Sequence, residues 1–111
     1  MSYSAPPKRS KYGNKKVEVD GVKFDSIKEA HRYGQLKMLE MSGWISNLRM
    51  QERFPLVVNG VKVGAYVADF VYDQNGKTVV EDVKSPITRK NRAYRLKRKI
   101  LAALGVEIVE V

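Results

Sequence analysis

Two Asn-Gly pairs divide the middle of the chain into three strand-like runs, and this pattern constrains the fold more than any other feature. Asn-Gly is the strongest short signal for a two-residue hairpin turn, because both residues tolerate the positive φ angles that such turns need. The pairs are Asn59-Gly60 and Asn75-Gly76, and the runs beside them are rich in valine and aromatic residues. Residues 54–58, 61–73 and 78–84 are therefore predicted to form an antiparallel three-stranded meander.

Helical patterns precede and follow the meander. Residues 17–24 alternate around Asp20-Gly21, which predicts a short hairpin, and a helix is expected from Asp25-Ser26 to about Ser42. Serine followed by proline is a typical helix start, so Ser85-Pro86 predicts a second helix that runs to about Leu104. The helical spacing of apolar residues places the core-facing stripes at Ile27, Ala30, Gly34, Met38 and Met41 and at Ala93, Leu96, Ile100 and Leu104.

The C-terminal residues 106–111 alternate as a strand does. After a helical crossover, this strand is expected to lie parallel to a strand of the meander. The predicted fold class is therefore α/β (α+β), with one mixed sheet flanked by helices in the order helix, three strands, helix and strand.

The length of 111 residues favours one domain, which we place at residues 17–111. Residues 1–16 contain basic residues and no acid, which predicts a flexible arm carrying Lys8, Arg9, Lys11, Lys15 and Lys16. The chain has no cysteine and one histidine, so thiolate zinc sites, disulfides and histidine metal clusters are excluded. No apolar run is long enough to cross a membrane and no signal peptide opens the chain, so we expect a cytoplasmic protein without an organic cofactor.

The net charge of +9 favours a polyanionic partner, most often a nucleic acid. The second predicted helix has seven basic residues and no acidic residue. A solvated face would explain them, but a phosphate backbone would also relieve their mutual repulsion. The helical wheel places Arg92, Arg95, Arg98 and Lys99 largely opposite the core stripe. The candidate DNA-binding residues of this helix are Arg89, Lys90, Arg92, Arg95, Lys97, Arg98 and Lys99, and the arm adds its own basic residues.

A symmetric turn at Asn75-Gly76 pairs two aspartates. In that register Asp69 faces Asp82, and Lys84 stands two residues further along the same face. Directly opposed like charges destabilise a sheet unless a shared proton or a divalent cation compensates them. Mg²⁺ prefers oxygen ligands, and a nearby lysine can orient water or stabilise charge on a phosphate. This set resembles a minimal metal-dependent phosphodiesterase site, and a solvent-facing Asp–Lys pair is the structural alternative.

Three further acidic residues have two interpretations each. Glu29 fits a capping box with Ser26, but it also lies on a stripe with Tyr33 and Leu36 that could border the metal site. Glu81 alternates away from Asp82, which favours a structural role over metal binding. A symmetric turn at Asn59-Gly60 pairs Glu52 with Val67, in line with Lys84, as a supporting group or as a surface residue. The same register points Gln51 away from the site.

The ordered motifs Lys23-Phe24-Asp25-Ser26 with Glu29-Ala30, then Tyr66-Val67-Ala68-Asp69-Phe70, then Glu81-Asp82-Val83-Lys84 resemble the PD-(D/E)xK nuclease superfamily. The pattern looks like that of small phage and prophage endonucleases related to Holliday junction resolvases. The resemblance covers about residues 12–111.

The resemblance implies a restriction-endonuclease-like αβββαβ core and DNA cleavage that depends on Mg²⁺, with Mn²⁺ as a substitute. It assigns Glu29, Asp69 and Asp82 to the metal, Lys84 to catalysis and Gln51 to a supporting position. It leaves a homodimer open. We therefore expect a structure-selective DNA endonuclease that resolves junctions or nicks DNA, in the cytoplasm of a bacterial host if the gene belongs to a phage. The alternatives are a non-catalytic DNA-binding protein on the same fold and an RNA-binding protein.

Overall fold

The computed structural model describes residues 16–111, and the basic residues Lys8, Arg9, Lys11 and Lys15 of the expected arm lie outside the described part. The chain divides into two compact units, residues 1–35 and 36–111, and each is described by itself. The single domain expected at residues 17–111 stays a prediction.

In the N-terminal unit, strands β1 (Val17–Val19) and β2 (Val22–Phe24) form an antiparallel hairpin, as predicted. Asp20 and Gly21 both have positive φ in its turn. Helix α1 (Ile27–Met41) begins in this unit and ends in the second. Its Tyr33 ring lies 5.0 Å from the ring of Phe24, and the Tyr33 hydroxyl donates a hydrogen bond to Asp20 Oδ2 at 3.2 Å. These contacts join the hairpin to the first half of the helix.

The face of α1 that is buried differs from the predicted one. Ile27, Met38 and Met41 are exposed, whereas Tyr33 and Leu36 are buried together with Glu29 and Ala30. The spacing of apolar residues suited both stripes, and the stripe that holds the larger aromatic side chain is the buried one. The Phe24–Tyr33 contact explains part of that preference.

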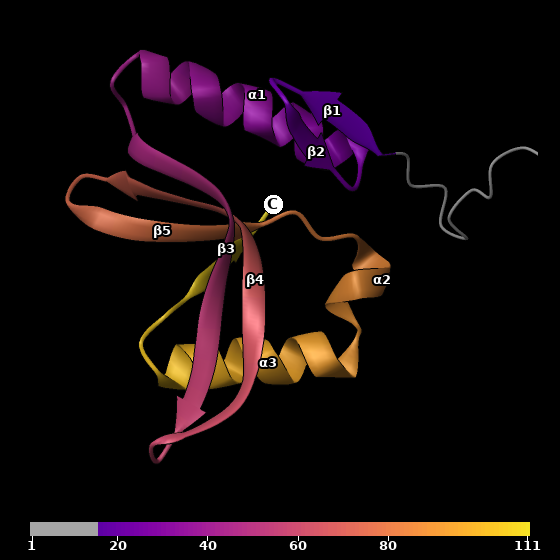
Figure 1. The fold of residues 1–111 in the computed structure, drawn as a ribbon, viewed down its shortest axis with the longest axis vertical. Coiled ribbons are helices and arrows are strands. Elements are labelled where there is room, and N and C mark those ends of the chain that lie inside the picture. Colours follow the sequence, from indigo (N-terminus) through magenta and orange to yellow (C-terminus); the bar gives the residue numbers. More distant parts are fainter. Residues whose placement is uncertain (1–15) are drawn as a thin grey trace, which may run out of the picture. The chain divides into compact units, whose positions relative to one another are not determined.

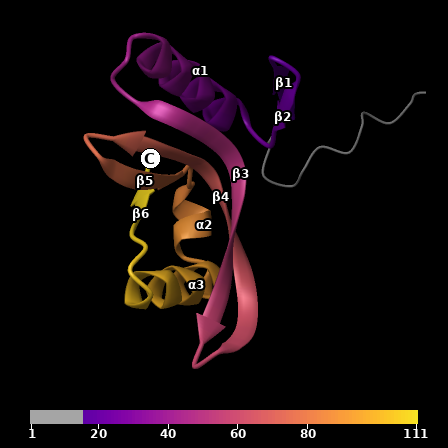
Figure 2. The same ribbon diagram turned by 60° about the vertical axis from the view of Figure 1, so that its left-hand side comes forward.

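The C-terminal unit contains a four-stranded mixed sheet, and it confirms the predicted fold class. Strands β3 (Ser46–Val58), β4 (Val61–Gln74) and β5 (Lys77–Asp82) are antiparallel, and β6 (Ile108–Glu110) pairs in parallel with β5. The strand order is β3-β4-β5-β6. Figure 1 shows β3 and β4 as a long twisted ribbon that extends past helix α3, and Figure 2 shows β6 beside β5.

The two Asn-Gly turns give different registers. Around Asn75-Gly76 the pairing is symmetric up to Phe70↔Glu81, as predicted. Around Asn59-Gly60 it begins symmetrically, but the register shifts between Leu56 and Val57, where the partners change from Gly64 to Lys62. This irregularity inserts one residue into β4 and changes the alignment of everything beyond it.

The second predicted helix is two helices. Helix α2 (Pro86–Arg89) begins after the N-cap Ser85, whose Oγ accepts a hydrogen bond from Thr88 N at 3.2 Å. Helix α3 (Arg92–Ala103) begins after a second N-cap, Asn91, whose Oδ1 accepts from Tyr94 N at 3.0 Å. The asparagine side chain replaces the backbone partners that a continuous helix would supply, so a helix ends and restarts there. None of the helices within residues 16–111 combines the length and the apolar character that crossing a bilayer requires.

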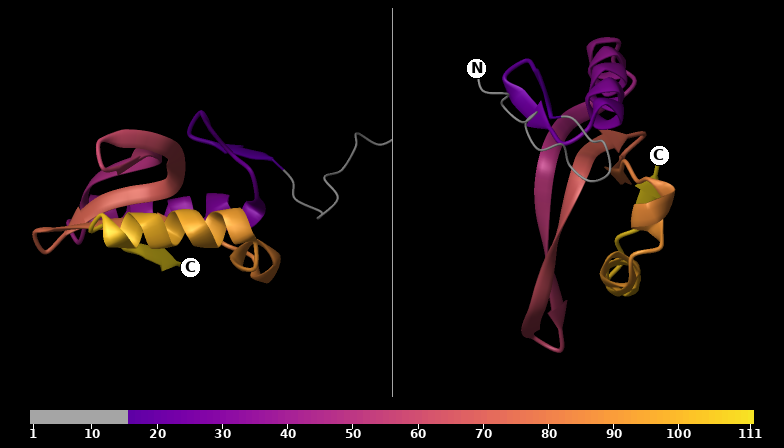
Figure 3. Two further views of the ribbon diagram at one scale, coloured as in Figure 1. Left: turned by 90° about the horizontal axis from the view of Figure 1, so that it is seen from below. Right: turned by 90° about the vertical axis from the view of Figure 1, so that its right-hand side faces the viewer.

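Helix α3 packs against the sheet through a face that the sequence did not predict. Its buried residues are Tyr94 and Leu101, with Ile100 partly buried, whereas Leu96 and Leu104 are exposed. Tyr94 and Leu101 are seven positions apart and therefore lie on one side of the helix. Figure 3 shows α3 running across the ribbon of β3 and β4. The core they join consists of Leu56, Tyr66, Ala68, Val71, Val80, Tyr94, Leu101 and Ile108.

Two leucines of the same segment test this corrected helix face. Leu101 is 1% exposed and Leu104 is 48% exposed. We expect Leu101→Ala to lower the free energy of unfolding by about 2–5 kcal/mol, because it leaves a cavity in the core. The matched control Leu104→Ala should cost less than about 1 kcal/mol. Urea unfolding followed by circular dichroism measures both, and equal losses would contradict the described packing.

Candidate active site

Asp69, within β4, and Asp82, the last residue of β5, lie beside each other on adjacent strands, as the sequence predicted. The backbone N–H of Asp69 donates to Asp82 Oδ1 at 2.9 Å. The backbone N–H of Val83 donates to Asp69 Oδ2 at 2.9 Å. Each carboxylate therefore reaches across to the backbone of the neighbouring strand. The two bonds replace the strand ladder at this point and fix both side chains relative to the sheet.

Asp82 is a fully buried carboxyl group with an unsatisfied oxygen. Its side chain is 0% exposed, and its Oδ2 has no hydrogen-bond partner in the described part of the chain. Burial raises the pKa of Asp82 to about 6, the hydrogen bond from Asp69 and the charge of Lys84 lower it, and the charge of Glu110 raises it. A buried oxygen without a partner is costly, and a bound cation or a proton would compensate it.

Lys84 brings a positive charge to this oxygen. Its Nζ lies 3.9 Å from Asp82 Oδ2, and the lysine side chain is only 17% exposed. The ammonium lies 4.7 Å from the ring centroid of Tyr94 and 5.9 Å from that of Tyr66. A cation near aromatic faces is attracted by the ring quadrupoles. The lysine is therefore held between an acidic group and two aromatic rings.

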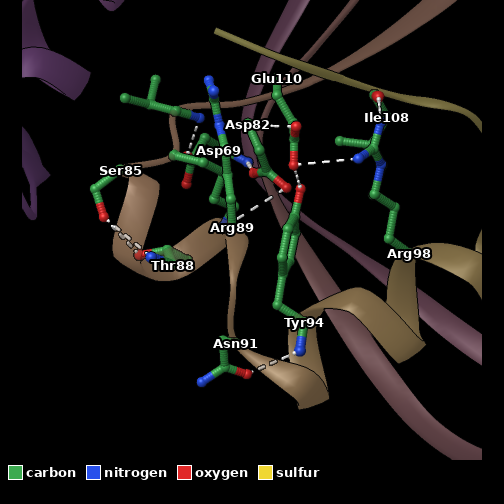
Figure 4. Close-up of polar contacts among 12 residues, drawn as sticks. Asp69, Asp82, Ser85, Thr88, Arg89, Asn91, Tyr94, Arg98, Ile108 and Glu110 are labelled. Atoms are coloured by element: carbon green, nitrogen blue, oxygen red, sulfur yellow. Dashed lines mark hydrogen bonds and ion pairs between the residues drawn. The ribbon is translucent and has the colours of Figure 1, made fainter.

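A second polar cluster centres on Glu110 of β6, next to Asp82 (Figure 4). The parallel register pairs Glu110 with Asp82. The Tyr94 hydroxyl donates to Glu110 Oε2, and Arg98 and Arg89 pair with the same carboxylate at 3.3 and 3.7 Å. Burial and the bond to Glu110 raise the pKa of the Tyr94 phenol above its ordinary value. The phenol is therefore kept as a hydrogen-bond donor.

The sequence did not identify Tyr66 and Glu110 as site residues. Tyr66 has a buried hydroxyl without a hydrogen-bond partner among the described residues. Glu110 had a usable signal, because it shares one side of the terminal strand with Ile108, which is buried. An acidic residue on the buried side of an alternating strand requires a partner in the interior.

Glu52 does not lie where the symmetric register put it. The register shift after Leu56 pairs Glu52 with Ala68 instead of Val67, so that prediction is wrong. A shift of one residue moves a side chain to the opposite face of the strand. The Glu52 carboxylate accepts from Arg49 Nε at 3.0 Å. Its proposed support of Lys84 thus loses its geometric basis.

The same shift changes the position of Gln51. This residue stands between the pairs Met50↔Phe70 and Glu52↔Ala68, at the level of Asp69, and has a φ of 56°. The register assumed for Gln51 therefore does not hold, and its supporting role stays a prediction.

Glu81 and Glu29 are both buried. Glu81 accepts a hydrogen bond from the Tyr72 hydroxyl on β4, which supports the structural interpretation. Glu29 lies in the first turn of α1, in the N-terminal unit, and its backbone N–H donates to the N-cap Ser26 Oγ at 3.0 Å.

Within residues 16–111, no group of three or more His, Asp or Glu side chains is arranged to hold a metal ion. The candidate metal ligands that the structure brings together are therefore Asp69 and Asp82.

The basic residues of α2 and α3 separate into two groups. Arg89 and Arg98 are paired with Glu110. The helical wheel placed Arg98 opposite the core, and its pairing with Glu110 differs from that prediction. Lys97 is half-buried. Arg89 and Arg98 are nevertheless exposed, and the other exposed basic residues of these helices are Lys90, Arg92, Arg95 and Lys99. Arg95, Arg98, Lys99 and Ala102 line a surface hollow of about 280 Å³. Three guanidinium or ammonium groups around one hollow suit an anion such as a phosphate.

Residues 9–108 match a family described as "Protein of unknown function (DUF1064)". Comparison with curated proteins found no match. Comparison with solved structures found none either.

The buried charge of Asp82 predicts a pH-dependent cost to stability. Its pKa is raised from 3.8 to about 6 by folding, so the folded state binds the proton more tightly than the unfolded state. Any stabilisation from this group is complete below about pH 4 and is lost as the pH rises through about 6. At pH 8 the ionised group costs about 3 kcal/mol relative to low pH. Asp82→Asn should therefore become more stable than the wild type as the pH rises from 4 to 8.

Urea unfolding of both proteins at pH 4, 6 and 8 measures this difference. Asp73→Asn, at a half-buried position on the same hairpin, is the control for the substitution itself. A difference between wild type and Asp82→Asn that stays constant across this range would contradict the buried-carboxylate description.

Proposed function

The chain belongs to the DUF1064 family, a family of unknown function, and we propose that it is a divalent-metal-dependent DNA endonuclease. The observation that carries the proposal is the pairing of the half-buried Asp69 with the buried Asp82, whose unsatisfied Oδ2 lies 3.9 Å from Lys84 Nζ. An oriented carboxylate pair beside a lysine is the donor set that metal-dependent phosphodiester hydrolysis uses. The resemblance of these motifs to the PD-(D/E)xK nucleases supports the same conclusion.

The donor set fits a hard divalent cation. Mg²⁺ is commonly held by one or two carboxylates, with waters and substrate phosphates completing its shell. Asp69 and Asp82 would hold Mg²⁺ or Mn²⁺, and Glu29 is proposed as a third carboxylate from the resemblance alone. When bound, such a cation polarises a phosphate and lowers the pKa of a coordinated water.

The chain's own residues would then act on the DNA backbone. Lys84 orients the attacking water and stabilises the negative charge that develops on the phosphate. The water oxygen bonds to phosphorus, the bond to the 3′ oxygen breaks, and that oxygen takes a proton. The products are a 5′-phosphate and a 3′-hydroxyl. The exposed basic residues of α2 and α3 hold the backbone on either side of the cut.

A branched or nicked DNA is the proposed substrate. The domain is small and has few residues left over to read base edges, so a fixed sequence is the less suitable target. A host-cell cytoplasmic setting and a homodimer belong to the proposal on the strength of the resemblance.

One observation favours a non-catalytic DNA-binding protein as the second candidate. Both aspartates accept backbone hydrogen bonds across β4 and β5, which is a structural use of a carboxylate. This candidate accounts for the basic surface but not for the unsatisfied Asp82 Oδ2.

Cleavage of supercoiled plasmid and of a four-way junction tests the endonuclease directly. We expect cutting with Mg²⁺ or Mn²⁺ and none with EDTA. Asp82→Ala and Lys84→Ala should each lower the rate by about 100-fold or more, because each removes a group that acts on the reacting phosphate. Asp73→Ala and Lys77→Ala, on the same hairpin, are the matched controls and should cut normally. A wild type that binds DNA and cuts neither substrate would favour the second candidate.

Mn²⁺ binding separates the two candidates without any cleavage. A preformed site stabilises the folded protein by about 2.7 kcal/mol when the free metal is 100 times its Kd. We expect Mn²⁺ to raise the Tm of the wild type and to leave that of Asp69→Ala unchanged. Calorimetry with EDTA-treated protein provides the measurement, and an unchanged wild-type Tm at millimolar Mn²⁺ would contradict the metal site.

The hollow on α3 predicts a salt-dependent contribution to DNA affinity. Arg95→Ala combined with Lys99→Ala should weaken binding of a 20-base-pair duplex in EDTA. It should also reduce the dependence of log K on log salt by about 2, because two phosphate contacts are lost. Fluorescence anisotropy between 50 and 300 mM NaCl measures the slope. Lys62→Ala, on the exposed β3–β4 turn, is the control, and an unchanged slope in the double variant would exclude this surface.

A further inference from the structure

Lys84 lies close to two aromatic rings as well as to the carboxylate of Asp82. Its Nζ lies 4.7 Å from the ring centroid of Tyr94 and 5.9 Å from that of Tyr66. The two rings lie 6.2 Å apart and are tilted by 36°. A lysine side chain has several rotatable bonds and little intrinsic preference for one position. The rings therefore restrict the positions that the ammonium can take over Asp82.

Tyr94 is in turn fixed at both of its ends. Its backbone N–H is bonded to the N-cap Asn91 at 3.0 Å, at the start of α3. Its hydroxyl donates to Glu110 Oε2 on β6. The helix start and the last strand thus set the position of one ring from two directions, and that ring contacts the lysine.

Glu110 is the centre of this arrangement. Arg98 Nη1 lies 3.3 Å and Arg89 Nε 3.7 Å from its carboxylate, and Arg98 Nη2 also donates to Ile108 O at 3.4 Å. The two arginines compensate a carboxylate that the sheet register places next to Asp82. Glu110 repels the ionised aspartate, and the two arginines weaken that repulsion. Burying one tyrosine hydroxyl requires a single hydrogen-bond partner, whereas this cluster adds two arginines to that partner.

We propose that Tyr94 and Glu110 are positioning residues, which hold the Lys84 ammonium over Asp82. Tyr94 acts through its ring on the lysine, and Glu110 acts through the phenol of Tyr94. The catalytic part of this inference rests on the proposed endonuclease function. The placement of Lys84 does not, and it is tested separately.

Nuclear magnetic resonance of the full chain tests the placement of the lysine without metal or DNA. Aromatic rings shift the signals of protons above their faces upfield. In protein labelled with ¹³C at the lysine ε carbon, one ε-methylene signal is expected upfield of the others and absent from Lys84→Arg. Tyr94→Leu should return that signal to the position of the other lysines. Tyr94→Phe keeps the ring but loses the bond to Glu110, so it should shift the signal partly, and Glu110→Gln should do the same. A Lys84 signal that is unchanged in Tyr94→Leu would overturn the proposal.

Kinetics with a saturating four-way junction and Mg²⁺ test the effect on catalysis. Tyr94→Leu should lower kcat about 10- to 100-fold, because displacing a catalytic group by about 1 Å has an effect of that order. Its KM should stay within about twofold. Tyr94→Phe should recover part of kcat, because it restores the ring but not the hydrogen bond to Glu110. A rise in KM with unchanged kcat would overturn the proposal in favour of DNA contact.

Controls distinguish the possible failures. Leu101→Ala removes a comparably buried side chain of the same helix, so its kcat shows what general destabilisation does. If Tyr94→Leu does not fold, Tyr94→Phe and Glu110→Gln carry the test, since both keep nearly the same volume. A wild type that cuts no DNA contradicts the proposed function, and the Lys84 signal then decides the positioning proposal alone.

Discussion

The buried carboxylate of Asp82 is the constraint on which the rest of the C-terminal unit depends. A charged oxygen away from water must be compensated, and the chain supplies only part of what it needs. One oxygen accepts from Asp69 N, and the other has no hydrogen-bond partner in the described residues and faces an ammonium at 3.9 Å. A domain of this size gains little by keeping such a group for stability. The cost of burying Asp82 is offset if this carboxylate binds a ligand.

The groups around Asp82 and Glu110 balance the negative charges of these two neighbouring carboxylates. Asp82 and Glu110 lie on paired strands, and Lys84, Arg89 and Arg98 are the positive groups near them. Tyr94 connects the two acidic residues. Its hydroxyl donates to Glu110, and its ring contacts the lysine that lies beside Asp82. This arrangement also gives the basic helices a second role. Some of their arginines stabilise the centre of the unit, and the rest remain available at the surface.

The sequence predicted features that depend on a few neighbouring residues. The turn at Asn75-Gly76 set the register of β4 and β5, and that register brought Asp69 to Asp82. The identical turn at Asn59-Gly60 predicted the pairs next to it but not those further along β3. An irregularity near Val63 changed the register at Glu52 and Gln51. A bulge depends on how a long ribbon bends over its core, and no short motif encodes it. The break at Asn91 was missed for a similar reason, since asparagine is a cap only where the chain changes direction.

The sequence by itself therefore determined the order of elements, the mixed sheet, the aspartate pair and its lysine. These follow from turn chemistry and strand periodicity, which act over a few residues. Only the tertiary structure decided which faces of α1 and α3 are buried, that the rings of Tyr66 and Tyr94 contact the lysine, and that Tyr94 bonds to Glu110. Several apolar stripes were available on each helix. The choice went with the contacts of a tyrosine ring, Tyr33 with Phe24 of the hairpin and Tyr94 with the core of the sheet. Contacts between residues far apart in the chain made that choice, because burial is a property of the assembled fold.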